Sequence, residues 1–146
     1  MRPYPEDVLR DVRATLENVV EPAVEDSYAR EQLGLAISLI EHVQLRIEQE
    51  PAMLREDSRD IVETLDRIGL PTGVGQAELA EQDLASLRAV NDRLTRSLQE
   101  AVRELESAVS AGDTDASERL QAVRALVRRQ LDRQRKMLGR GYRAGT

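Results

Sequence analysis

Apolar residues recur every three or four positions along most of the chain, the spacing that places side chains on one face of an α-helix. In the N-terminal half this pattern covers residues 5–69. It is broken by Pro22 and Pro51, which cannot donate a helical hydrogen bond. Asp26 is a good N-terminal cap for the second helix, and Gly69 is typical of the position just after a helix. The pattern therefore predicts three helices in this half.

The second of these helices carries an apolar run, "LGLAISLI" (residues 33–40), that extends around more than one face. Such a helix is expected at the centre of a bundle or in a subunit interface. The run is far shorter than the roughly 20 apolar residues needed to cross a bilayer, and the N-terminus lacks the apolar centre of a signal peptide. We therefore expect a cytoplasmic protein without membrane contact.

The stretch "GLPTGVGQ" is the part of the chain richest in Gly and Pro, and it predicts a loop over residues 70–76. Apolar periodicity resumes over residues 77–138 and is interrupted by the sharp-turn sequence "AGDTDAS", so two long helices should form an antiparallel hairpin. The glycines in residues 139–146 predict a flexible tail. Together, these segments predict an all-α, up-and-down bundle of four to five helices in a single domain, residues 1–146.

The first helix of the predicted hairpin carries a heptad-like apolar seam with one asparagine inside it. In coiled coils, a polar residue at such a position fixes the register and the oligomeric state. We therefore predict a homo-oligomer, most simply a dimer, whose hairpins are either intramolecular or exchanged between copies. The residues of this possible oligomer seam are Leu87, Asn91, Leu94, Leu98 and Leu105.

Composition excludes several chemistries. The chain has no cysteine, so it has no disulfide, no thiolate nucleophile and no Cys-ligated metal. His42 is the one histidine, and the paired Glu-x-x-His signature of di-iron bundles is missing. His42 could act as a general base oriented by Glu41, but a lone histidine beside an apolar stripe is more often a structural residue. We therefore expect a non-enzymatic protein without a metal or other cofactor.

The charges are unevenly distributed along this chain of net charge −6, because basic residues gather in "RALVRRQLDRQRKMLGRGYR", residues 124–143. This segment could complement an acidic neighbouring helix, with Asp92, Glu100, Glu104 and Glu106 facing Arg119, Arg124, Arg128 and Arg135. Alternatively, Arg128, Arg129 and Arg133 could bind an anion, because arginine forks suit phosphate. Nucleic acid is disfavoured, since no aromatic residue lies among these arginines before Tyr142 and the rest of the chain is acidic.

Two N-terminal segments, "RPYPEDVLRDVRATLENVVEPAV" and "YAREQLGLAISLIEHVQLRIEQE", carry a family resemblance. They resemble the opening of small helical proteins of unknown function from actinobacteria and proteobacteria, encoded beside acyl-CoA dehydrogenases and aminoglycoside-phosphotransferase-like kinases. The resemblance covers about the first 60 residues and does not include the helical hairpin. It implies a genomic context and carries over no site residue.

Two functions from different classes are compatible with these patterns. We favour a helical bundle that acts through protein–protein interaction, with a second copy of itself as the first partner. The alternative is an accessory protein that binds a phosphorylated or acyl-CoA-type small molecule through the arginine-rich helix. The identity of a protein partner or ligand, the number of subunits and the pathway are not encoded in any motif of the sequence.

Overall fold

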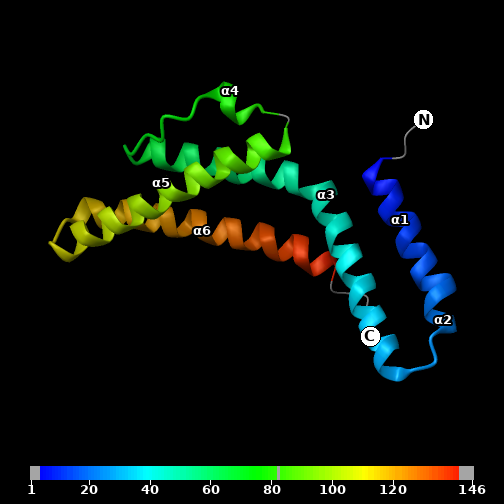
Figure 1. The fold of residues 1–146 in the computed structure, drawn as a ribbon. Coiled ribbons are helices and arrows are strands. Elements are labelled where there is room, and N and C mark those ends of the chain that lie inside the picture. Colours follow the sequence, from blue (N-terminus) through cyan, green and yellow to red (C-terminus); the bar gives the residue numbers. More distant parts are fainter. Residues whose placement is uncertain (1–3, 82, 142–146) are drawn as a thin grey trace. The chain divides into compact units, whose positions relative to one another are not determined.

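The computed structural model describes residues 4–81 and 83–141, with side chains as far as Met137, and it is all-α (Figure 1). No strand occurs among these residues. Four long helices carry the fold, and short helical turns join them. In chain order the elements are α1 (Pro5–Thr15), the π-helical turn η1 (Leu16–Val20), α2 (Glu21–Ala23), α3 (Ser27–Arg67), α4 (Gln76–Leu79), α5 (Leu84–Ser110) and α6 (Thr114–Gly141).

Helix α3 is a single helix of 41 residues, so the predicted break at Pro51 is wrong. A proline inside a helix removes one hydrogen-bond donor and crowds the preceding turn, at a cost of about 3 kcal/mol. That cost is local, so a proline weakens one turn without necessarily ending the helix. The second and third predicted helices are therefore the two halves of α3.

The ends of α3 follow the predicted capping pattern. The carboxylate of Asp26 accepts a hydrogen bond from the amide of Ala29 at 2.8 Å, which satisfies a free donor of the first turn. Gly69 has a φ of +80°, and the amide of Leu70 donates to the carbonyl of Leu65 at 2.9 Å. This left-handed glycine and the bond across it terminate the helix.

Helices α5 and α6 form the predicted antiparallel hairpin within one chain (Figure 1). Gly112 ends α5 with a φ of +90°, and the Asp113 carboxylate accepts from the amide of Ala116 at 3.1 Å to begin α6. Three residues connect the two helices, so the chain reverses its direction in a tight turn. Helix α6 continues to Gly141, so the first part of the predicted tail is helical, whereas residues 142–146 lie outside the described residues.

The chain divides into two compact units. Unit 1 combines residues 1–50 with residues 136–146, and unit 2 contains residues 51–135. The loop at 70–76 was expected to separate two halves, but Leu70 and Val74 of this loop pack against the core of unit 2. The loop therefore belongs to unit 2, and the division falls inside the helices α3 and α6.

Unit 2 has a continuous aliphatic core. Five of its side chains, from α3, α5 and α6, are at most 1% exposed: Ile61, Leu65, Leu94, Val123 and Leu126. The short helix α4 adds Leu79 to the same cluster. Complete burial of such a side chain contributes about 1.5–3 kcal/mol, so this core accounts for the stability of unit 2.

Unit 1 has much less buried apolar surface. Among the described residues of α1, η1, α2 and the first half of α3, Ile37 is the one hydrophobic side chain in the buried class, at 8% exposed. Polar contacts supplement the packing: the guanidinium of Arg13 donates to the Gln44 amide oxygen at 3.1 Å and lies 3.7 Å from the Glu41 carboxylate. The described residues of α1, η1, α2 and the first half of α3 thus form no closed apolar core.

Candidate functional site

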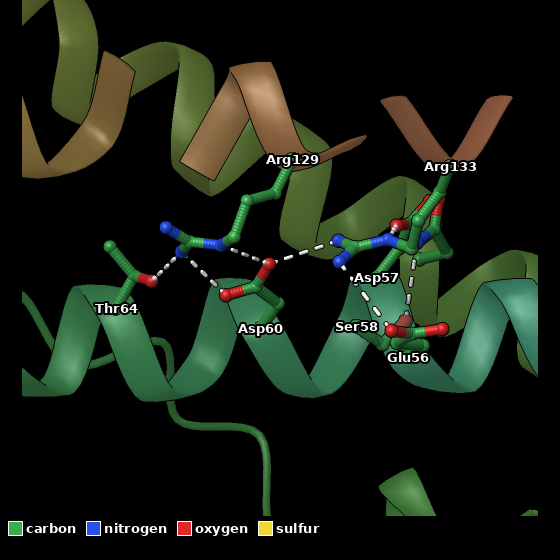
Figure 2. Close-up of polar contacts among 8 residues, drawn as sticks. Glu56, Asp57, Ser58, Asp60, Thr64, Arg129 and Arg133 are labelled. Carbon is green, nitrogen blue, oxygen red and sulfur yellow. Dashed lines mark hydrogen bonds and ion pairs between the residues drawn. The ribbon is translucent and has the colours of Figure 1, made fainter. Parts of the chain in front are cut away.

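Two arginines of α6 meet a row of polar residues on α3 within unit 2 (Figure 2). Arg133 donates from Nε to Oδ1 of Asp57 at 2.6 Å and from Nη2 to Oδ2 of Asp60 at 2.9 Å. Its Nη1 lies 3.7 Å from the carboxylate of Glu56. Arg133 is therefore surrounded by three carboxylates of the facing helix.

Arg129, one turn earlier on α6, holds the same row of α3 residues. Its Nε and Nη2 donate to the two carboxylate oxygens of Asp60 at 3.0 and 2.7 Å, a bidentate pair. Its Nη2 also donates to the hydroxyl of Thr64 at 3.3 Å (Figure 2). Because residues four apart share a face of a helix, both arginines of α6 meet one stripe of α3. We call these six residues the ion-pair cluster: Glu56, Asp57, Asp60, Thr64, Arg129 and Arg133.

The electrostatics of the cluster differ between its two aspartates. Burial raises the pKa of Asp57 and outweighs the lowering effect of its hydrogen bond and ion pair with Arg133. Burial also acts to raise the pKa of Asp60, but hydrogen bonds from Arg129 and Arg133 outweigh it, so this pKa is lowered. The pKa of each arginine is raised by its carboxylate partners. The cluster is thus an internal charge network in which Asp60 is the central anion.

This geometry bears directly on the predicted anion site of Arg128, Arg129 and Arg133. Carboxylates of the chain itself already occupy the guanidinium groups of Arg129 and Arg133, while Arg128 extends away and its Nε donates to the backbone carbonyl of Arg124 at 3.4 Å. The structure therefore brings two of the three arginines together and places their donors on protein groups. Arg128 is not part of this arrangement.

The predicted pairing between α5 and α6 is replaced by pairing between α3 and α6. Among the described residues, none of the four proposed acids of α5 forms an ion pair with Arg119, Arg124, Arg128 or Arg135. The acids that do pair, Glu56, Asp57 and Asp60, stand at helical spacing on α3. Arg129 and Arg133 lie four residues apart on α6, so they also share one face of a helix. This corresponding helical spacing of acids and arginines was the signal in the sequence that could have identified the pairs.

The seam predicted for a second copy lies inside the chain's own core. The leucines Leu87, Leu94, Leu98 and Leu105 are between 0% and 6% exposed. The amide Nδ2 of Asn91 donates to the hydroxyl of Ser58 on α3 at 3.2 Å. The burial of these leucines is therefore accounted for by packing within the chain, and their role in an oligomer stays a prediction.

His42 is half-buried on α3. Within the described part of the chain it takes part in no hydrogen bond or ion pair, and its neighbour Glu41 faces Arg13. The described residues contain no group of three or more His, Cys, Asp or Glu arranged to hold a metal. The catalytic pairing of Glu41 with His42 thus gains no supporting contact.

Exposed apolar side chains are concentrated in unit 1. Leu35, Leu39 and Val43 recur every four residues on one face of α3 and are 56%, 66% and 44% exposed. On α1, Val8 and Val12 line a groove of about 360 Å³. Among the described residues, the large hydrophobic side chains of unit 1 that remain exposed are Tyr4, Val8, Val12, Val19, Val20, Tyr28, Leu35, Leu39 and Val43. These exposed side chains, which the sequence suggested only through the apolar run of residues 33–40, are the best candidates for a functional surface.

Comparison with known proteins adds no further constraint. No family model, no curated protein and no solved structure matches this chain. Within the described residues, no helix combines the length and apolar content needed to span a bilayer. The family resemblance of the N-terminal segments accordingly stays a prediction, and the candidate surface has to be argued from this structure alone.

Proposed function

We propose that this protein is a non-enzymatic helical protein that acts by self-association, and that the exposed apolar surface of unit 1 forms the contact. The observation that carries the proposal is the contrast between the two units. Unit 2 closes an aliphatic core, whereas unit 1 leaves nine large hydrophobic side chains between 36% and 71% exposed. Apolar surface concentrated in this way on a folded protein is typical of an interaction site.

The physical reason is that a helix stabilises a bundle by burying its apolar stripe against neighbouring helices. In α1 and the first half of α3, much of that stripe stays exposed among the described residues. Association with further helices would cover Leu35, Leu39 and Val43, each of which contributes about 1.5–3 kcal/mol on full burial. A second copy of the chain would supply such helices, so no other protein is required as the partner.

Sedimentation equilibrium of the purified chain, from low to high micromolar concentration, tests the proposal. The wild type should associate, and the double variant Val12→Gln with Leu39→Gln should shift towards monomer. Glutamine is chosen because it removes apolar contact without changing the net charge. Ala14→Gln with Ser38→Gln is the matched control, because both positions are exposed on the same two helices.

The control should associate like the wild type, and all variants should keep the same far-ultraviolet circular dichroism. A wild type that sediments as a monomer throughout would overturn the proposal. Undiminished association of the Val12→Gln, Leu39→Gln variant would overturn the assignment of the surface.

A further inference from the structure

The outer face of α6 combines exposed apolar side chains with unpaired cations. Val127 and Leu131, at 36% and 45% exposed, are large exposed hydrophobics of unit 2. Arg124, Arg128 and Arg135 stand at three- and four-residue spacing around them, so helical geometry places all five on one side of the helix. We call these five residues the α6 outer face.

This face is separate from the ion-pair cluster. Figure 2 shows the side chains of Arg129 and Arg133 directed at α3, where their donors are occupied. By contrast, Arg124, Arg128 and Arg135 are exposed and form no ion pair among the described residues. Three charges and two apolar side chains are therefore available for a partner.

A surface of complementary character lies on α1 of unit 1. The groove there is shallow and open, is mostly apolar, and is lined by Val8, Asp11, Val12 and Thr15 of α1 and Leu16 of η1. The Asp11 side chain is 80% exposed, and its one ion-pair contact is 3.9 Å from Arg10. We call this surface the α1 groove.

The segment that carries the groove is acidic overall. Residues 4–50 contain eleven Asp and Glu against four Arg. Two α1 grooves placed against each other would oppose like charges, which disfavours a symmetric contact between them. A basic amphipathic helix, in contrast, would satisfy both the apolar groove and its charge.

We propose that the α6 outer face of one copy docks into the α1 groove of a second copy. The proposal rests on the self-association proposed above and names the two surfaces that meet. Val127 and Leu131 contact the apolar side chains of this surface, and Arg124, Arg128 and Arg135 meet its acidic side chains. Because the two surfaces differ, the copies associate either as a reciprocal pair or head to tail in a closed ring or an open chain.

Charge exchange between the two surfaces tests this assignment by sedimentation equilibrium at low ionic strength. The α6 variant carries Arg124→Glu, Arg128→Glu and Arg135→Glu, and the α1 variant carries Asp11→Arg and Thr15→Arg. Each variant alone should associate at least tenfold more weakly than the wild type, about 1.4 kcal/mol. An equimolar mixture of the two should regain association, because the basic groove of one then meets the acidic α6 of the other.

The control for the α6 variant is Arg96→Glu, Arg103→Glu and Arg119→Glu, which gives the same change in net charge at exposed positions outside both surfaces. This control should associate like the wild type at matched protein concentration. If the wild type associates and the α6 variant does so equally well, or if the mixture stays monomeric, the docking assignment is wrong while self-association stands. If the wild type is itself monomeric, both proposals fail together.

Discussion

The guanidinium of Arg133 donates to the carboxylate of Asp57 over 2.6 Å, although 76 residues separate the two in sequence. This contact lies beyond Leu126, the last buried side chain among the described residues of α6. In this part of unit 2, polar contacts take over from the hydrophobic core in attaching α6 to α3. The stability of that attachment should therefore depend on individual charged groups.

Replacement of Asp60 by asparagine should destabilise the fold. Asp60 accepts three hydrogen bonds from Arg129 and Arg133, so its loss leaves both guanidiniums short of partners, and that of Arg133 is partly buried. We expect the free energy of unfolding to fall by about 2 kcal/mol, the usual scale for hydrogen bonds to a charged group. Urea unfolding followed by circular dichroism measures this change.

Asp66→Asn is the control for this variant, because Asp66 is an exposed acid on the same helix. Its effect should stay within about 0.5 kcal/mol, as for other surface substitutions. Equal stabilities of the Asp60→Asn and Asp66→Asn variants would show that the ion-pair cluster does not stabilise unit 2.

The two aspartates of the cluster should respond to acid with opposite signs. The pKa of Asp60 lies below its usual value of 3.8, so its contribution is present above that pH and is lost as the pH falls further. The pKa of Asp57 is raised by burial, so the folded chain takes up this proton before the unfolded chain does. Protonation of Asp57 therefore favours the folded state as the pH falls through its raised pKa.

Unfolding free energies measured across the acid range should separate these effects. The loss of stability on acidification should be shallower in Asp60→Asn than in the wild type, and steeper in Asp57→Asn. Parallel curves for the three proteins would contradict the assigned directions of the two pKa shifts.

The hydrogen bond from Asn91 to Ser58 should contribute to folding and leave the oligomeric state unchanged. Its donor and acceptor lie 3.2 Å apart, and Ser58 is 2% exposed, so removal of either partner leaves a polar group poorly satisfied. In a double-mutant cycle with Ser58→Ala and Asn91→Leu, we expect a coupling of about 1 kcal/mol. Strict additivity, or a change in sedimentation of Asn91→Leu, would contradict this role.

Substitution of Pro51 by alanine should stabilise the protein. Alanine restores the missing amide donor within α3 and has a helix propensity about 3 kcal/mol more favourable than that of proline. We expect a gain of about 1–3 kcal/mol in thermal or urea unfolding. Pro71 lies in an exposed loop, where proline restricts the conformations of the unfolded chain. Pro71→Ala should therefore have the opposite effect and destabilise the protein slightly.

The all-α fold, the α5–α6 hairpin and most helix ends could be predicted because they depend on local rules. Apolar spacing identifies helices, and Asp26, Gly69 and Asp113 act at the positions that capping chemistry assigns to them. Pro51 was misjudged because a local penalty at one residue does not by itself end a helix. The two compact units depend on which segments touch, which the local pattern does not state.

The candidate surfaces were harder to predict because sequence periodicity does not say what covers an apolar stripe. The seam from Leu87 to Leu105 has the pattern of an oligomer interface, yet α3 and α6 of the same chain cover it. Conversely, Leu35 and Leu39 read as buried residues and are more than half exposed. The sequence shows that Arg133 belongs to a basic helix. Whether it pairs with acids of α3 or of α5 follows only from tertiary packing.

The exposure of Tyr4 and Tyr28, at 71% and 69%, has a practical consequence for optical work. The chain has no tryptophan or phenylalanine, so the aliphatic core of unit 2 contains no chromophore that would sense its packing. The emission of Tyr4 and Tyr28 should accordingly change little when unit 2 melts. Because Tyr4 directly precedes α1 and its groove, the same emission is suited to report the arrival of a second molecule.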